Sequence, residues 1–279
     1  MTLNIEPTIS RYIEVITPNL QRGRMRTALF DFDGTISLIR EGWQSIMIPM
    51  MTEILLQTPR HEDPQTIKKV VREFVTRLTG KQTIYQMIQL CDEIAKRGGT
   101  PEDPLFYKNL YNERLNVHIQ GRISALKNGQ AAPGEMCVPG AFEWLNILKK
   151  HGVRCYLASG TDEKYVFEEA ELLGLPPYFE GIYGAKDDYQ SFSKKVVIDR
   201  IIAEHQLHGS EFTTFGDGYV EIEDAKSVGG IAVGLATNEK DRSGIDEWKR
   251  SRLISAGADL IIPDFRYAFE LEEYLFAEE

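Results

Sequence analysis

Cysteine is scarce in this sequence: only Cys91, Cys137 and Cys155 occur in 279 residues. Three scattered thiols are too few for a disulfide framework, and they lack the paired spacing of a structural zinc site. Their scarcity excludes a disulfide-rich secreted fold and agrees with a reducing cytoplasm. Cys155 stands in an apolar run and is predicted to lie in the core.

Long apolar runs and clustered basic residues are also lacking. No segment approaches the roughly 20 apolar residues that cross a bilayer, and no apolar signal segment is found at the N-terminus. Asp and Glu outnumber Lys and Arg by 42 to 32, and the net charge of -10 disfavours binding to nucleic acid or an anionic membrane. The one short basic cluster, Arg22, Arg24 and Arg26, is interpreted as solvated surface. We therefore expect a cytoplasmic protein that binds neither nucleic acid nor membrane.

Short apolar segments alternate with amphipathic segments near the start of the chain and throughout its second half. Strands are predicted at residues 27–33, 153–158, 212–215, 231–235 and 260–262. Helices are predicted at residues 140–151, 194–206, 221–228, 245–255 and 266–276. Because strands alternating with helices form parallel sheets covered on both faces, the sequence predicts an α/β fold with a doubly wound parallel sheet.

The segment from residue 37 to about 132 has a different pattern, with 3.6-residue periodicity and no convincing strand. Glycines and prolines divide it into four predicted helices, at residues 41–57, 64–78, 82–97 and 104–127. We therefore predict two domains: an α/β core of residues 1–36 and 137–279, and an all-helical cap of residues 37–136 inserted after the first strand.

Several polar residues fall where the predicted strands end. Asp31 and Asp33 end the first strand, and Ser159-Gly160-Thr161 ends the second. Gly216-Asp217-Gly218 ends a later strand, and Lys194 opens the helix before it. Ligands of open parallel sheets bind at the carboxyl ends of the strands, so these side chains are expected to converge there.

Such a set of groups suits phosphoryl transfer. Clustered carboxylates favour Mg²⁺, and a carboxylate such as Asp31 can attack phosphorus to give an aspartyl-phosphate. Asp33 can act as general acid and then base, provided that its pKa is raised relative to its neighbour. Ser159 and Lys194 can bind the phosphate, and Asp217 can complete the metal shell. Gly34 gives the backbone room to approach the phosphate.

These motifs resemble those of the haloacid dehalogenase (HAD) superfamily. The similarity rests on Asp31-Phe32-Asp33-Gly34-Thr35, the Ser-Gly-Thr at 159–161, Lys194 placed 23 residues before Asp217, and Glu221 four residues after Asp217. The resemblance implies that Asp31 is the nucleophile and Asp33 the acid/base, and that both bind Mg²⁺ with Asp217. It leaves Glu221 as a further ligand or an orienting group, because the family more often has aspartate there. The phosphate-binding residues implied are Gly34, Thr35, Ser159, Gly160 and Lys194, with Lys195 as the rival of Lys194.

The family's reaction types differ at the position of Asp33. Dehalogenases and phosphonatases lack an acid there, whereas phosphatases and phosphomutases have it. The resemblance therefore implies a phosphoric monoester hydrolase acting on a small phosphorylated metabolite, such as a sugar phosphate. A phosphomutase is the alternative, and a non-catalytic phospho-ligand binding protein is a third hypothesis that the complete set of motifs disfavours.

Substrate choice is predicted to depend on the cap. The loop containing Lys81, Gln82 and Thr83 resembles in position the specificity loop of helical caps, and its alternative interpretation is an ordinary helix end followed by a new helix start. Glu41 and Trp43, close after the nucleophile strand, are predicted either to line the cleft or to belong to the hinge.

Overall fold

The computed structural model describes residues 12–188 and 193–277. Seven strands in these ranges form one sheet, in the order β1-β7-β6-β5-β2-β3-β4. The strands are β1 (Glu14–Val15), β2 (Thr27–Phe30), β3 (Arg154–Asp162), β4 (Gly181–Ala185), β5 (Phe212–Gly216), β6 (Ile231–Leu235) and β7 (Leu260–Ile262). Neighbouring strands are parallel except for β1, which pairs antiparallel with β7. The predicted α/β class with a largely parallel sheet is confirmed.

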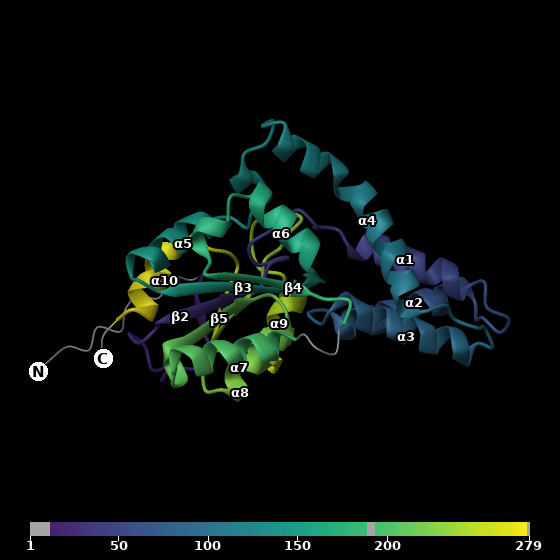
Figure 1. Ribbon diagram of the computed structural model, residues 1–279. Coiled ribbons are helices and arrows are strands. Elements are labelled where there is room, and N and C mark those ends of the chain that lie inside the picture. The colour runs from purple at the N-terminus through teal and green to yellow at the C-terminus, as the bar shows by residue number, and fades with distance from the viewer. Residues whose placement is uncertain (1–11, 189–192, 278–279) are drawn as a thin grey trace, which may run out of the picture.

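Helices cover both faces of this sheet (Figure 1). One face carries α5 (Ala141–Lys150), α6 (Glu163–Leu172) and α10 (Ala268–Leu275). The other carries α7 (Lys194–His205), α8 (Tyr219–Ser227) and α9 (Glu247–Ser255). Successive residues of β2 point to opposite faces: Phe30 joins the apolar cluster of Trp144, and Leu29 joins that of Ile198. This alternation explains why the strand is apolar throughout.

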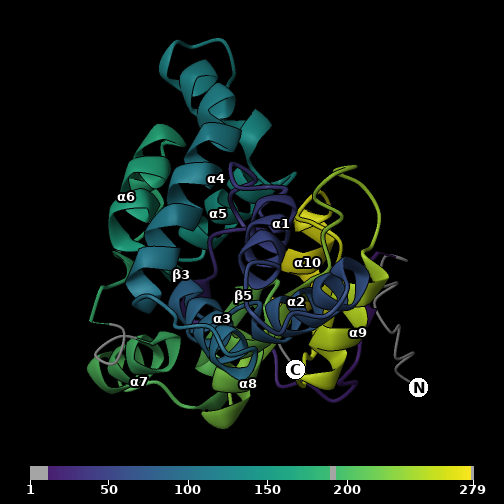
Figure 2. The ribbon, with the colours of Figure 1, turned by 90° about the vertical axis from the view of Figure 1, so that its right-hand side faces the viewer.

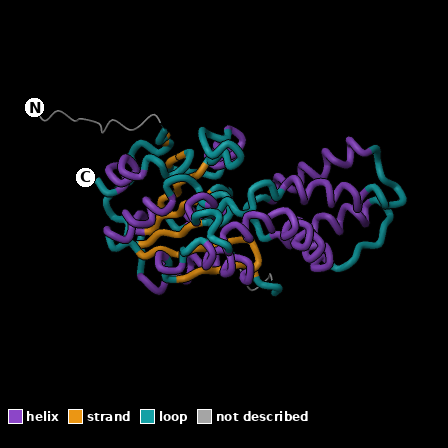
Figure 3. The backbone as a smooth tube through the Cα atoms, turned by 90° about the horizontal axis from the view of Figure 1, so that it is seen from above, coloured by secondary structure: helices purple, strands orange, loops and turns teal. Residues whose placement is uncertain are grey.

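Four further helices form a lobe that projects from the carboxyl-end side of the sheet (Figures 1 and 3). They are α1 (Gln44–Leu55), α2 (Pro64–Leu78), α3 (Thr83–Lys96) and α4 (Pro104–Lys127). Asp63 and Asp103 cap α2 and α4 by accepting hydrogen bonds from backbone N–H groups, and a proline follows each cap. These local signals explain why α2 and α4 begin where the sequence predicts.

Several predicted boundaries differ from the structure. β2 ends at Phe30, so Asp31 and Asp33 lie in the following loop, which turns at Gly34 with a φ of +81°. β3 extends to Asp162, beyond the predicted end at residue 158. Three elements were not predicted from the sequence: β1, β4 and α6. Of these, β1 and β4 are strands that depend on pairing with strands elsewhere in the chain.

Three 3-10 turns complete the described structure, at Pro133–Met136, Pro176–Tyr178 and Gly209–Glu211. No helix in the described ranges combines the length and the apolar character that crossing a membrane requires.

Candidate active site

Asp31 and Lys194 form a buried ion pair at the carboxyl end of the sheet. Lys194 Nζ lies 2.5 Å from Asp31 Oδ1 and 2.8 Å from Glu221 Oε2. Lys194 is the first residue of α7, where Ser193 caps the helix by accepting a hydrogen bond from the Val196 N–H. Burial lowers the pKa of Lys194, but the two carboxylates outweigh it and hold the pKa above its usual value. The site therefore contains a fixed positive charge beside the Asp31 carboxylate.

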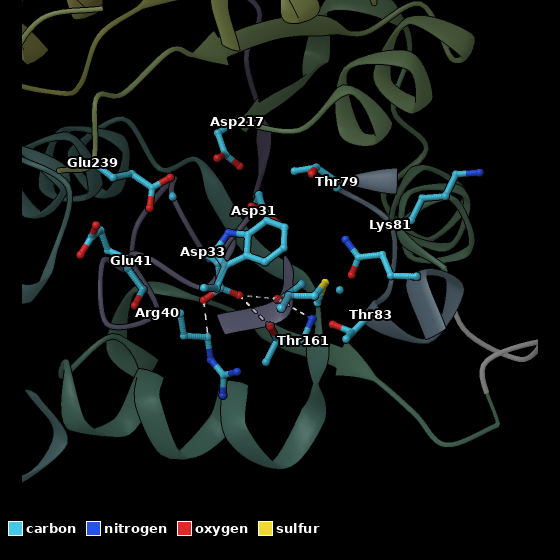
Figure 4. A pocket seen from close by; sticks show the side chains of 18 of the residues that line it. Asp31, Asp33, Arg40, Glu41, Thr79, Lys81, Thr83, Thr161, Asp217 and Glu239 are labelled. Carbon is cyan, nitrogen blue, oxygen red and sulfur yellow. Dashed lines mark hydrogen bonds and ion pairs between the residues drawn. The ribbon is translucent and has the colours of Figure 1, made fainter. Parts of the chain in front are cut away.

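The carboxyl group of Asp33 is held by two hydroxyls at the end of β3. Its Oδ2 accepts hydrogen bonds from Ser159 Oγ at 3.2 Å and from Thr161 Oγ1 at 2.9 Å. Its Oδ1 is buried without a hydrogen-bond partner among the described residues, and Arg40 Nε lies 3.9 Å away (Figure 4). Burial raises the pKa of Asp33, against the opposing effects of Arg40 and the two hydroxyls. A carboxyl group with a raised pKa is suited to donate a proton.

Asp217 follows β5 and is flanked by two groups from later in the chain. Lys249 Nζ, on α9, lies 2.7 Å from Asp217 Oδ2 and 2.5 Å from Glu239 Oε1. The Asp217 N–H donates a hydrogen bond to Thr35 Oγ1 at 3.1 Å. A Cβ at Gly34 would lie 2.4 Å from Asp217 Oδ2, so glycine is required by this close approach as well as by its positive φ. Thr35 is fully buried behind Asp217.

Carboxylate oxygens of Asp31, Asp217 and Glu221 lie within 4.8 Å of one another. With Glu239, this region holds four carboxylates against two lysine ammonium groups, which leaves a formal net charge of -2. Carboxylate oxygens are the ligands that hard divalent cations prefer. Both the donor atoms and the charge of the site therefore fit a divalent metal ion.

The loop of residues 79–83, between α2 and α3, closes the site from the side of the helical lobe. A Cβ added at Gly160 would lie 2.9 Å from the Lys81 carbonyl oxygen, and one added at Gly80 would lie 3.3 Å from Gly218 Cα. The backbones of loop and core are therefore in contact, which small residues permit.

These groups enclose a cavity of about 100 Å³. Among the residues predicted from the first motif and the later strands, those that line it are Asp31, Asp33, Gly34, Ser159, Gly160, Lys194 and Asp217. Among those predicted to contact the substrate, Glu41, Trp43, Lys81 and Thr83 line it (Figure 4). Gln82 is buried but does not line the cavity. The structure thus brings most of the predicted site residues together around one space.

Comparison with known families identifies the chain. The family model described as haloacid dehalogenase-like hydrolase matches residues 25–229, which include all four sequence motifs. This chain belongs to the haloacid dehalogenase-like hydrolase family. The resemblance seen in the sequence is confirmed.

Solved structures of HAD proteins share the fold at low sequence identity. A predicted phosphoglycolate phosphatase from Haemophilus somnus is 16% identical, with a TM-score of 0.59, covering 89% of this chain and 98% of its own. A family IA, variant 3 HAD hydrolase from Entamoeba histolytica is 20% identical, with a TM-score of 0.57 and coverages of 87% and 95%. A β-phosphoglucomutase from Clostridium difficile is 13% identical, with a TM-score of 0.53 and coverages of 83% and 98%. The chain matches no curated protein.

Several side chains around the site of this HAD-like hydrolase were not predicted from the sequence. Glu169 of α6 accepts bidentate hydrogen bonds from the Arg40 guanidinium at 2.7 to 3.2 Å, and both side chains are buried. Glu239 and Lys249 flank Asp217, and Tyr111 reaches the cavity from α4. None of these residues belongs to a local motif, so only the spatial arrangement reveals them.

One arginine joins the HAD core to the helical lobe. Arg252 of α9 donates hydrogen bonds to the carbonyl oxygens of Thr76, of Arg77 at 3.0 Å and of Thr79 at 2.9 Å. Its guanidinium lies 4.5 Å from the ring centroid of Tyr219. The core thus bonds carbonyls at the end of α2, including that of Thr76, which also accepts a hydrogen bond from the Thr79 N–H.

We expect Arg252→Gln to loosen the loop of residues 79–83, because a neutral, shorter side chain cannot reach three carbonyls. Amide hydrogen exchange in this loop should quicken, and KM should rise about 3- to 10-fold with a smaller change in kcat. Arg200→Gln is the matched control, because Arg200 also stacks on a tyrosine ring but contacts no carbonyl of the lobe. Equal exchange rates in both variants and wild type would contradict this role.

Proposed function

We propose that the protein is a Mg²⁺-dependent phosphatase that hydrolyses a small phosphorylated metabolite through an aspartyl-phosphate on Asp31. One observation carries this proposal: Asp31 has a lysine ammonium at 2.5 Å and opens into the same cavity as Asp33. A nucleophilic carboxylate, a fixed cation and a separate proton donor are the groups that a two-step phosphoryl transfer to water requires.

In the first step, an Asp31 oxygen attacks phosphorus while the bond from phosphorus to the leaving oxygen breaks. Lys194 offsets the negative charge of Asp31 and of the phosphoryl group, and Asp33 transfers its proton to the leaving alkoxide. In the second step, a water oxygen attacks phosphorus and transfers a proton to Asp33. The bond from phosphorus to the Asp31 oxygen breaks, which frees phosphate and restores the Asp31 carboxylate. Ser159 and Thr161 hold the Asp33 carboxyl group in place through both steps.

Asp31 and Asp217 are proposed to hold Mg²⁺, with the main-chain carbonyl of Asp33. When bound, Mg²⁺ offsets the charge repulsion between the carboxylates and the substrate phosphate. Glu221 contacts both Lys194 and the Gly218 N–H, at 2.8 and 2.7 Å, and these contacts support an orienting role for it.

The proposal predicts metal-dependent phosphate release from p-nitrophenyl phosphate. Chelation by EDTA should remove at least about 99% of the activity, because the carboxylates that line the cavity, among them Asp31, Asp217 and Glu239, would then repel the phosphate. Adding Mg²⁺ back should restore it. Phosphate release that chelation leaves unchanged would contradict a role for the metal.

A phosphomutase is the alternative, and one structural relative is named as such. The cavity of about 100 Å³ favours hydrolysis, because a mutase must let a phosphorylated sugar turn around inside its closed site. Incubation with glycerol 3-phosphate and, separately, with a hexose 1-phosphate, followed by phosphorus NMR, separates the two. Free phosphate supports the phosphatase, and migration to another hydroxyl supports the mutase.

We also propose the domain division that this reaction needs, with residues 1–36 and 137–279 as the catalytic core and residues 37–136 as the cap. The contacts of Gly160 and Gly218 with the loop of residues 79–83 support it, because they place the cap over the catalytic groups. The substrate would then be enclosed between core and cap, away from bulk water.

A further inference from the structure

Uncharged side chains form much of the cap side of the cavity, where the charged residues Arg40, Glu41 and Lys81 also line it. Trp43, Met47, Thr83, Gln86 and Tyr111 line it there, opposite the groups that face the phosphate. Trp43 and Met47 provide apolar surface, and the other three provide hydroxyl or carboxamide groups. A leaving group in this space therefore meets neutral donors and acceptors on an apolar background.

Gln86 and Tyr111 are buried polar residues whose side chains have no hydrogen-bond partner in the part of the chain that the structure describes. Each is only 4% exposed and lines the cavity. In residues 12–188 and 193–277, no side chain or backbone group forms a hydrogen bond with the Gln86 carboxamide or the Tyr111 hydroxyl. Buried polar groups normally have a partner, because an unmatched one costs free energy. Both groups are therefore available to hydrogen-bond a ligand.

The charged side chains near this part of the cavity already have partners or point elsewhere. Arg40 is paired with Glu169, and Glu41 is paired with Arg122 at 2.6 Å. Lys81 is exposed, and its side chain extends away from Asp31 (Figure 4). Among the described residues on this side of the cavity, Lys81 is the cation without an ion-pair partner. A carboxylate on the leaving group would thus meet no cation held in place there, and an amine would meet no unpaired carboxylate on the cap side.

The size of the cavity restricts the substrate further. Its volume of about 100 Å³ is well below the ~300–1,000 Å³ of typical ligand pockets. Seen from the cap side, α1 to α4 lie over the carboxyl end of the sheet, so a large leaving group would have to displace them (Figure 2). The closed site suits a phosphoryl group joined to an alcohol of about two to four carbons.

We propose that the substrate is the phosphate monoester of a small, uncharged polyol, and that Gln86 and Tyr111 are the residues that select it. This assignment rests on the proposed phosphatase function and refines it. The Gln86 carboxamide and the Tyr111 hydroxyl bind hydroxyl groups of the alcohol, while Trp43 packs against its carbon chain. A carboxylated or aminated ester of equal length is rejected, because its charge would be buried without a partner.

The test compares three-carbon and two-carbon esters with wild-type protein and Mg²⁺. We expect kcat/KM for glycerol 3-phosphate to exceed that for 3-phosphoglycerate and for phosphoethanolamine by about 100-fold or more. Glucose 6-phosphate should also be poor, because of its size. Equal rates, or a preference for either charged ester, would overturn the assignment.

Two variants test the named residues. Gln86→Leu and Tyr111→Phe should each lower kcat/KM for glycerol 3-phosphate about 10-fold, while propyl phosphate, which has no hydroxyl, should change less than about 2-fold. Gln89→Leu and Tyr107→Phe are matched controls on the same helices, because neither residue lines the cavity. An equal loss on both esters would show a structural effect and contradict the assignment of these residues.

Different results would contradict the phosphatase function and the substrate assignment. No phosphate release from any ester, including p-nitrophenyl phosphate, would contradict the phosphatase function and remove the basis of the assignment. Release from p-nitrophenyl phosphate with a flat or reversed ranking of the esters would overturn the assignment alone.

Discussion

Asp31→Asn is expected to lower kcat about 10⁴-fold or more. The amide has nearly the shape of the carboxylate, so Lys194 and Glu221 keep their places, but its oxygen is a poor nucleophile for phosphorus. Phosphate release from p-nitrophenyl phosphate with Mg²⁺ measures the loss. Asp199→Asn is the matched control, because it makes the same substitution at an exposed carboxylate on α7 that pairs with Lys195.

The same variant tests whether an aspartyl-phosphate forms on Asp31. Wild-type protein quenched in acid during turnover should carry a phosphoryl group on the peptide that contains Asp31, and Asp31→Asn should not. Mass spectrometry of the digested protein distinguishes the two. If Asp31→Asn retained turnover and neither protein gave a phosphorylated peptide, the covalent mechanism would be contradicted.

Lys194→Met should abolish activity and also lower the free energy of unfolding by about 3–5 kcal/mol without metal. The variant leaves the carboxylates of Asp31 and Glu221 buried with no cation between them, and uncompensated buried charge is costly. Unfolding in urea, followed by circular dichroism, measures this loss. Mg²⁺ should recover part of it, because the cation would replace some of the missing positive charge.

Lys195→Met is the control for this second prediction. Lys195 is partly exposed and pairs with Asp199 one turn along α7, so its loss should change the free energy of unfolding by about 0.5 kcal/mol or less. The two variants also decide between the neighbouring lysines that the sequence offered. Loss of activity in Lys195→Met, with Lys194→Met active, would reverse our assignment.

The main elements of the fold were predictable because their signals are local. Asp63-Pro64 and Asp103-Pro104 mark the starts of α2 and α4 through caps and fixed backbone angles, and apolar runs mark β5 and β6. β1 was missed because a two-residue strand exists through pairing with a distant partner, which no local window contains. β4 was missed because two glycines and partly exposed residues interrupt its apolar run.

Part of the site lies beyond any sequence signal. Glu239 and Lys249 come from a loop and a helix with no motif, yet both lie against Asp217. Gln86 and Tyr111 have the same residue types as Gln89 and Tyr107 on the same helices. The rotation of each helix about its own axis, which packing against the core sets, places Gln86 and Tyr111 at the cavity and Gln89 and Tyr107 away from it.

By itself the sequence determined which catalytic groups would meet. Asp31 and Asp217 follow the parallel strands β2 and β5, and Ser159 lies near the end of β3 beside them. The carboxyl ends of neighbouring parallel strands lie along one edge of the sheet whatever else the chain does. Tertiary structure alone decided what the cap presents to them. The docking of α2 and α3, through Arg252 and the contact at Gly160, depends on packing between segments far apart in the chain. That packing sets the size of the cavity and brings uncharged side chains such as Gln86 and Tyr111 to it.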